Sequence, residues 1–108
     1  MDNVKAMSGG CVLDFSVSKD VKKQWVNDNY PEWSQEQKEL FVHWANWNAL
    51  EMEWVVSPST AAKIIGVKTQ TVQKWCKDGK IKAYQNSISW WHIPLDVVLE
   101  LQAQRQES

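Results

Sequence analysis

Four polar side chains in the second half of the sequence have the types and spacing needed to read a nucleic acid. They fall at i, i+3, i+4 and i+7, which places them on one face of a helix. They are Gln70, Gln73, Lys74 and Lys77. Val72, Trp75 and Cys76 repeat at i, i+3 and i+4 on the opposite, apolar face. A Gln amide pairs with adenine N6 and N7, and a Lys ammonium with guanine or phosphate, so this helix is predicted to contact DNA.

The residues before this helix predict a first helix and a tight turn that position it. Ser57 suits an N-cap, and Pro58 suits the first helical position, where no amide hydrogen bond is lost. Small and branched apolar residues follow at 61–65, and Gly66 is expected to end the helix in the left-handed conformation. The second helix is then predicted to begin at Thr69, or at Lys68, and to end at residues 78–79.

The residues after the second helix predict a two-stranded wing. Residues 80–84 alternate polar and apolar side chains, residues 85–87 form a polar turn, and residues 88–93 are rich in β-branched and aromatic types. Pro94 is expected to end the second strand. A last helix is predicted to open at Asp96 or at the residue before it.

The run AAKIIGVKTQTVQKWCKDGKIKAY, followed by WHIP, resembles the winged helix-turn-helix of the MerR-like and excisionase-type DNA-binding families. The resemblance covers residues 57–102. It implies a mostly α fold with a small β-hairpin wing, preceded here by an N-terminal helical extension. Two positions depart from the pattern: Lys68 stands where Ser or another cap is usual, and Trp90 stands where a basic residue is common. Fewer phosphate contacts are therefore expected from this wing.

The expected partner is double-stranded DNA, bound through the second helix and its surroundings. Gln70 and Gln73 are assigned to base edges, and Thr71 to a thymine methyl group or a phosphate. The other lysines are assigned to phosphates and the wing tip to an adjacent groove. The full set of expected DNA-contacting residues is Lys68, Thr69, Gln70, Thr71, Gln73, Lys74, Lys77, Lys80, Lys82, Asn86 and Ser87.

The charge distribution agrees with this assignment. The 108 residues carry a net charge of −1. Residues 1–56 hold five lysines and nine acids, whereas residues 57–94 hold six lysines and one acid, Asp78. Basic charge is thus concentrated on the segment that is predicted to face phosphates. The alternative is a solvated lysine face without a partner.

The N-terminal half is divided into an irregular segment at 1–18, with a short strand at 11–15, and a Trp-rich helical extension at 19–56. A helix is predicted over 19–27. Ser34 with Gln37 predicts a capping box at the start of a second helix, running from Gln35 to about Trp54. The helix-turn-helix domain is assigned to 57–104.

Five of the eight Trp residues precede residue 57. The favoured interpretation is that they fill a small core. The alternatives are an exposed seam for self-association or for a protein partner, and a platform that stacks single-stranded bases. The acidic character of this half disfavours the last of these.

Several classes of function are not expected. The two His and two Cys residues lack metal-ligand spacing, no glycine-rich phosphate loop is present, and no acid–base couple or catalytic triad is suggested. We therefore expect no enzymatic activity, no metal and no cofactor. No signal peptide or membrane span is predicted, and the cysteine usage favours a cytoplasmic setting.

The resemblance implies a phage or mobile-element protein that acts as an excisionase-like recombination directionality factor or a small transcription regulator. We expect neither the long coiled coil nor the effector domain of MerR-type regulators. Two alternatives remain open. A small terminase subunit that recognises packaging DNA would assemble as a ring, which light scattering detects. A protein-interaction module that has lost DNA binding would give no gel shift.

Overall fold

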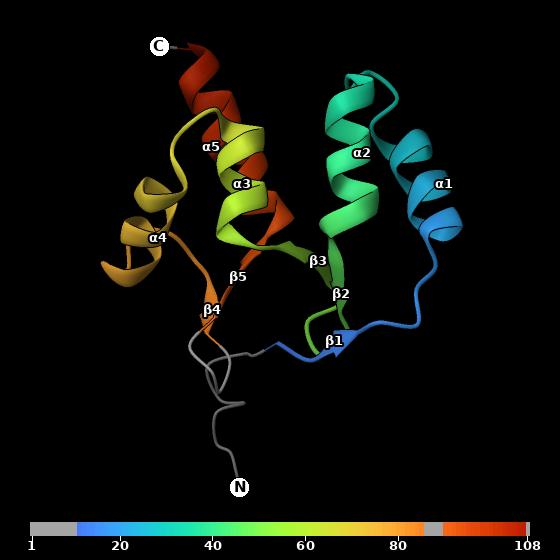
Figure 1. Cartoon of the computed structure of the whole chain (residues 1–108), viewed down its shortest axis with the longest axis horizontal. Helices are drawn as coiled ribbons and strands as arrows, with labels where there is room; N and C mark the ends of the chain where they lie inside the picture. The colour runs from blue at the N-terminus through green and yellow to red at the C-terminus, as the bar shows by residue number, and fades with distance from the viewer. Residues whose placement is uncertain (1–10, 86–89, 108) are drawn as a thin grey trace, which may run out of the picture.

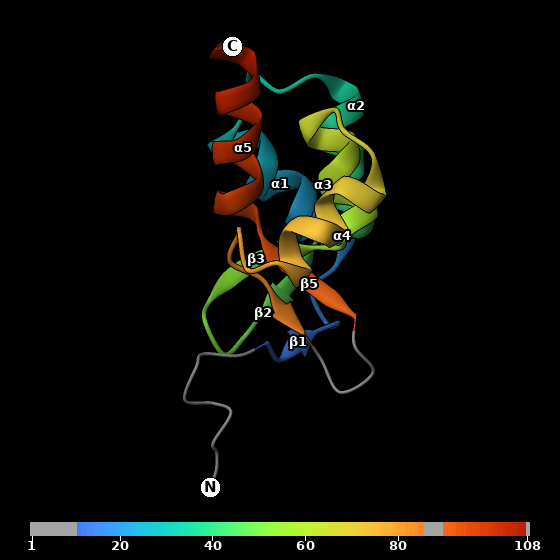
Figure 2. The same ribbon diagram turned by 90° about the vertical axis from the view of Figure 1, so that its left-hand side faces the viewer.

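The computed structural model describes residues 11–85 and 90–107 and shows helices over one antiparallel sheet (Figure 1). The helices lie on the same side of the strands in both ribbon views (Figures 1 and 2). The elements in chain order are β1 (Leu13–Asp14), α1 (Lys19–Asn29), α2 (Gln35–Trp44), β2 (Asn46–Asn48), β3 (Glu53–Val56), α3 (Pro58–Ile65), α4 (Thr69–Lys77), β4 (Tyr84–Gln85), β5 (Trp91–Pro94) and α5 (Leu95–Glu107).

The helix starts are determined by local sequence. The hydroxyl of Ser18 accepts from the Val21 amide, and that of Ser34 accepts from the Gln37 amide at 3.1 Å. Only this half of the predicted capping box forms. The Gln37 side chain instead bonds Gln102 of α5, at 3.4 to 3.5 Å, and so ties α2 to the C-terminal helix.

The predicted continuation of α2 to Trp54 is wrong. The helix ends at Trp44, and the chain then forms the hairpin β2–β3. Trp47 and Trp54 face each other across this hairpin, with ring centroids 5.0 Å apart. A spacing of seven residues fits two helical turns, but it fits this cross-strand pair equally well.

Two buried polar groups select the hairpin over the longer helix. The Asn48 side-chain oxygen, which is fully buried, accepts from the amides of Leu50 at 3.2 Å and Val12 at 3.0 Å. The buried Lys22 ammonium donates to the Ala45 carbonyl at 2.6 Å, one residue past the end of α2. The Leu50 amide and the Ala45 carbonyl are backbone groups that a continued helix would have paired internally.

The sheet is larger than the predicted wing. Its five strands run in the order β1-β2-β3-β5-β4, and every pairing is antiparallel. The predicted short strand near residue 11 is confirmed as β1 at one edge. The wing hairpin β4–β5 is confirmed at the other edge, with Tyr84 opposite His92. β3 joins the two parts because Val56 pairs with Ile93 of β5.

The wing is shorter than predicted. Residues 80–83 were expected in its first strand, but β4 begins only at Tyr84. The Lys80 amide bonds the Trp75 carbonyl at 2.9 Å, which keeps Lys80 in the turn that closes α4. Residues 86–89, which include most of the predicted turn, lie outside the described residues. Pro94 ends β5, and α5 begins at Leu95, as predicted.

A single hydrophobic core joins the two halves of the chain. Val26 of α1 and Phe41 of α2 belong to the same buried cluster as Val72 of α4 and Val98 of α5. Six aromatic rings of the N-terminal half contact one another in series, from Trp33 and Tyr30 through Trp25 and Phe41 to Trp54 and Trp47. This result confirms the favoured interpretation for Trp25, Trp33, Trp47 and Trp54, which fill or border the core. It is wrong for the fifth, Trp44, which is 59% exposed.

Candidate nucleic-acid interface

The helix α3 and the turn after it hold α4 in place. The Ser57 hydroxyl accepts from the Thr60 amide at 3.3 Å, and Pro58 opens the helix. Gly66 has φ 91° and ψ 36°, and its amide bonds the Ala62 carbonyl at 2.8 Å. Val67 follows the glycine, and its half-buried side chain packs against the core. The predicted left-handed turn is therefore confirmed.

The helix α4 has one buried and one exposed face. Val72 is fully buried and Cys76 is 4% exposed, while Trp75 is half-buried and packs against the core. Burial raises the pKa of the Cys76 thiol to about 11, so this thiol stays protonated at neutral pH. The opposite face is solvent-exposed and consists of Gln70, Gln73, Lys74 and Lys77.

No side-chain hydrogen bond caps the start of α4. The helix begins at Thr69, and Lys68 occupies the N-cap position without a side-chain cap hydrogen bond. Thr69 and Thr71 are half-buried, so they offer less surface to a ligand than the two glutamines on this helix. The Thr71 and Val72 amides bond the Lys68 carbonyl at 3.0 and 3.3 Å, and the first two amides of the helix are the ones that can meet an acceptor such as a phosphate oxygen.

The remaining predicted contacts lie around this face. Lys68, Lys80 and Lys82 are all exposed, and the Lys82 ammonium lies 5.6 Å from the centroid of the Tyr84 ring. The Lys74 ammonium is 3.4 Å from the Asp78 carboxylate, one helical turn later. Asn86 and Ser87 lie outside the described residues.

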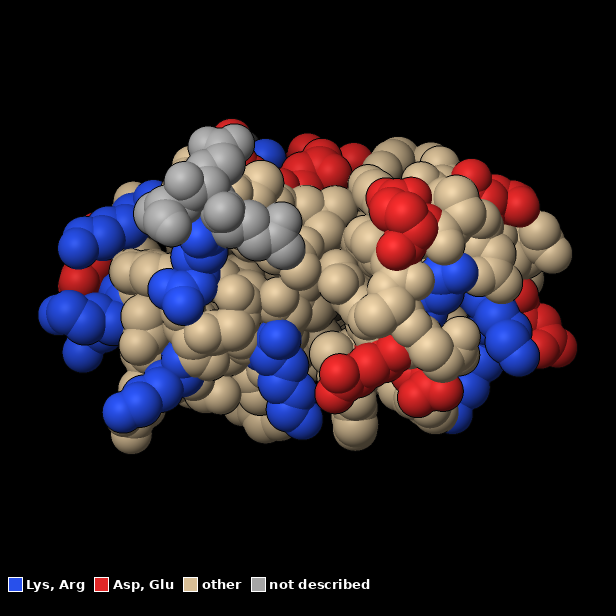
Figure 3. Space-filling view, turned by 90° about the horizontal axis from the view of Figure 1, so that it is seen from above, with Lys and Arg blue, Asp and Glu red and all other residues tan. Residues whose placement is uncertain are grey.

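The charge separation seen in the sequence is also a separation in space. Figure 3 shows mainly Lys and Arg side chains at the end of the molecule that carries α4, whereas the α1–α2 end shows most of the acidic side chains in view together with further lysines. The exposed lysines of the first end are Lys63, Lys68, Lys74, Lys77, Lys80 and Lys82. Such a concentration attracts a polyanion to one end of the protein.

The wing is anchored to the N-terminal hairpin by a hydrogen bond. The Tyr84 hydroxyl donates to a Glu53 carboxylate oxygen at 2.6 Å, which links β4 to β3. Burial of Tyr84, together with this bond and the Glu53 charge, raises the pKa of Tyr84 well above its ordinary value. The position of the wing beside α4 thus depends on a residue from the N-terminal half.

The structure also reveals a cleft that the sequence did not predict. It has a volume of about 660 Å³ and lies between α4 and the sheet. Thr69 and Gln73 of α4 line it, together with three largely exposed aromatic residues, Phe15, Trp44 and Trp90. Trp91 packs against the core and also lines this cleft. The three exposed aromatic residues come from segments that are distant in sequence, so no local sequence pattern predicts the cleft.

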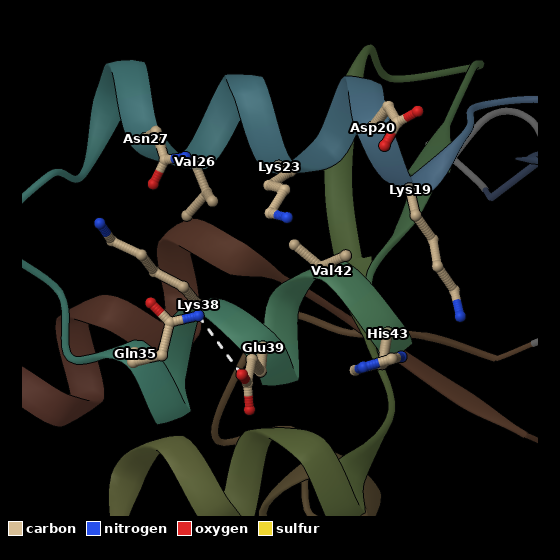
Figure 4. A pocket seen from close by; sticks show the side chains of 10 residues that line it. All are labelled: Lys19, Asp20, Lys23, Val26, Asn27, Gln35, Lys38, Glu39, Val42 and His43. Atoms are coloured by element: carbon tan, nitrogen blue, oxygen red, sulfur yellow. Dashed lines mark hydrogen bonds between the residues drawn. The ribbon is translucent and has the colours of Figure 1, made fainter.

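A second hollow, between α1 and α2, is smaller and mixed in charge. Its volume is about 300 Å³, and lysine, acidic and amide side chains line it together with Val26, Val42 and His43 (Figure 4). Gln35 donates to Glu39 across one helical turn at 3.3 Å (Figure 4). Within the described residues, no three potential metal ligands cluster in the structure.

Both cysteine thiols are weak nucleophiles at neutral pH, because their pKa values are raised. Burial, with the Glu53 charge as a second cause, raises the pKa of the Cys11 thiol to about 11. Cys11 and Cys76 are both free thiols. Over the part of the chain that the structure describes, no helix is long and apolar enough to cross a membrane.

One of three comparisons with known proteins gave a match. Neither the search of curated proteins nor the search of solved structures gave a match. One family model, that of a helix-turn-helix domain, does match residues 55–106. These residues span the end of β3, both helices of the motif, the wing and nearly all of α5. The C-terminal half of the chain is therefore a helix-turn-helix domain, a fold that supports binding of double-stranded DNA.

Proposed function

We propose that this chain binds double-stranded DNA sequence-specifically, with α4 in the major groove. The observation that carries the proposal is the two-faced character of α4. Its apolar face is held by the core at Val72 and Cys76, so the outward direction of Gln70 and Gln73 is determined. A helix face fixed in this way presents both amides to the groove, where each can make paired hydrogen bonds to adenine.

The lysines around α4 supply affinity without sequence preference. Lys74 and Lys77 flank the groove, while Lys68, Lys80 and Lys82 contact phosphates and fix the register. Neutralising about five phosphates would give a slope of roughly −4 to −5 for log affinity against log salt. The proposed role of Asn86 and Ser87 is a wing contact beside the groove.

The proposed biological role is that of an excisionase-like recombination directionality factor or a small transcription regulator of a phage or mobile element. One helix reads few base pairs, so useful specificity requires several copies or a partner protein. We propose that the N-terminal half supplies that protein contact. Its support is the surface of the β2–β3 turn, where Leu50 is 49% and Met52 is 69% exposed. Light scattering in the presence of DNA measures the number of copies bound.

The experiment begins with selection of binding sites from random duplexes, followed by anisotropy titrations on the selected site and on random DNA. We expect Gln73→Ala to weaken binding to the selected site by about five- to a hundredfold, because one bidentate base contact is lost. Binding to random DNA should change less than twofold. Lys77→Ala should weaken both and reduce the salt slope by about 0.9.

Gln24→Ala is the matched control, because Gln24 is an exposed glutamine on α1, far from α4 (Figure 1). It should bind both DNAs as the unsubstituted chain does. Equal weakening on selected and random DNA by Gln73→Ala would refute the base-reading role. Absence of any shift on random duplex at low salt and micromolar protein would refute DNA binding altogether.

A further inference from the structure

Three large aromatic side chains remain exposed although the core is well filled. Phe15 is 77%, Trp44 is 59% and Trp90 is 66% exposed. They come from the turn after β1, the end of α2 and the residue before β5, and they line the same cleft. Isolated exposed apolar residues are ordinary, but three large rings gathered around one hollow mark a binding surface.

The cleft is continuous with the DNA-reading face. Thr69 and Gln73 of α4 form part of its wall, and Gln73 also belongs to the exposed face assigned to base edges. In Figure 2 the side of the molecule that carries α4 faces the viewer, with β5 close to α4 and β1 below. Any duplex that contacts Gln73 therefore lies at the mouth of this cleft.

The lining chemistry suits the uncharged parts of a nucleotide. Among the described residues that line the cleft, none is acidic, so nothing there repels a DNA strand. The polar lining consists of neutral donors and acceptors, among them Asn46, Ser57 and Ser59. In a duplex the base faces are covered by neighbouring bases, so aromatic rings pack against deoxyribose and thymine methyl groups, while hydroxyl and amide groups bond sugar and phosphate oxygens.

We propose that this cleft is a second DNA-contacting surface, which receives the deoxyribose rings and thymine methyl groups of the strand that runs past the N-terminal half of α4. The proposal rests on the proposed function, since it takes the duplex bound by α4 as its occupant. Trp90 directly precedes β5 at the edge of the wing, and its ring is 66% exposed. The contact proposed for Trp90 is apolar, so its energy does not come from counterion release.

This origin gives the surface a distinctive signature in a salt titration. Removal of a lysine contact makes the slope of log affinity against log salt less steep. Removal of an apolar contact leaves this slope unchanged. We expect Trp44→Ala and Trp90→Ala each to weaken binding about five- to thirtyfold at every salt concentration between 50 and 200 mM. Phe15→Ser should act in the same direction. None of the three should alter the slope.

The control is Val21→Ala, which shortens an exposed apolar side chain on α1 that does not line the cleft. It should bind as the unsubstituted chain does. Circular dichroism melts of each variant establish that the fold is retained, and this is expected because the three aromatics are exposed. A second measurement avoids substitution: photocrosslinking of the full chain to duplex containing 5-iododeoxyuridine should label peptides that contain Trp44 or Trp90.

The outcomes separate the two proposals. If the cleft variants bind DNA within twofold of the unsubstituted chain while Gln73→Ala and Lys77→Ala still weaken binding, DNA binding stands and the cleft proposal is refuted. A cleft that serves a protein partner instead would give this same result. If the unsubstituted chain binds no DNA, both proposals fail. Loss of affinity with a flatter salt slope would also contradict the apolar contact.

Discussion

The ion pair between Lys74 and Asp78 leads to a prediction about DNA affinity. Asp78 is the only acid within residues 57–94, and its carboxylate lies 3.4 Å from the Lys74 ammonium on the proposed DNA face. When DNA binds, this carboxylate repels the phosphates and competes with them for Lys74. Asp78→Asn removes both effects and keeps the size of the side chain.

The substitution should leave the fold almost unchanged. The side chains of Lys74 and Asp78 are 73% and 38% exposed, so water screens the pair, which is worth at most about 0.5 kcal/mol. Asp78 also caps the C-terminal end of α4, where the helix dipole disfavours a carboxylate by about 0.3 to 1 kcal/mol. These opposing contributions leave a net change in unfolding free energy of about 0.5 kcal/mol or less.

The effect on DNA binding should be larger and should depend on salt. One released lysine adds about −0.9 to the slope of log affinity against log salt. We therefore expect Asp78→Asn to bind more tightly at 50 mM salt, and the advantage to shrink by about threefold at 200 mM. Anisotropy titrations over this range measure both quantities. Asp28→Asn is the matched control, because it makes the same charge change on an exposed residue of α1.

Two results would refute this reasoning. An unchanged slope for Asp78→Asn would show that Asp78 does not compete with phosphate for Lys74, whatever happens to the affinity. An equal gain for Asp28→Asn would show that net charge, and not the position of Asp78, controls binding.

Two further predictions concern stability. Gly66→Ala should lower the unfolding free energy by about 1 to 2 kcal/mol, which is a fall in Tm of about 4–8 °C. The cause is the backbone alone, because φ is 91° and an added Cβ meets no atom within 4 Å. A loss above about 3 kcal/mol in a thermal melt would contradict this conformational origin. Burial lowers the pKa of His92, so the unfolded chain takes up a proton below pH 6.5 before the folded chain does. Stability should therefore fall by up to about 1.4 kcal/mol at pH 5.5 from this residue alone, and denaturant titrations at pH 7.5 and 5.5 should show a smaller pH dependence for His92→Gln, whereas an equal dependence would exclude His92 as the source.

The helix-turn-helix could be predicted because its signals are local. Ser57, Gly66 and the spacing of Val72 and Cys76 each act within one or two helical turns, and the structure agrees with all of them. The outward direction of Gln73 follows from the same periodicity. These elements need little information from the rest of the chain.

The N-terminal half was harder because its determinants are distant in sequence. The spacing of Trp47 and Trp54 satisfies a helix and a hairpin alike, and Asn48 decides between them through a bond to Val12, which is 36 residues away. The cleft raises the same difficulty. Phe15, Trp44 and Trp90 meet only through the order of strands in the sheet, which no periodicity in the sequence specifies.

The central position of β3 couples the N-terminal half of the chain to the helix-turn-helix half. Val55 pairs with Asn46 of β2 on one side and with Pro94 of β5 on the other. The family match begins at this residue, in the middle of the strand, so a fragment cut there would remove half of the neighbour of β5. We therefore expect opening of the N-terminal hairpin to be coupled to displacement of the wing. If the proposed wing contact and protein partner exist, linkage predicts that a protein bound to this hairpin strengthens DNA binding, and that bound DNA slows exchange of the hairpin amides by the same free energy.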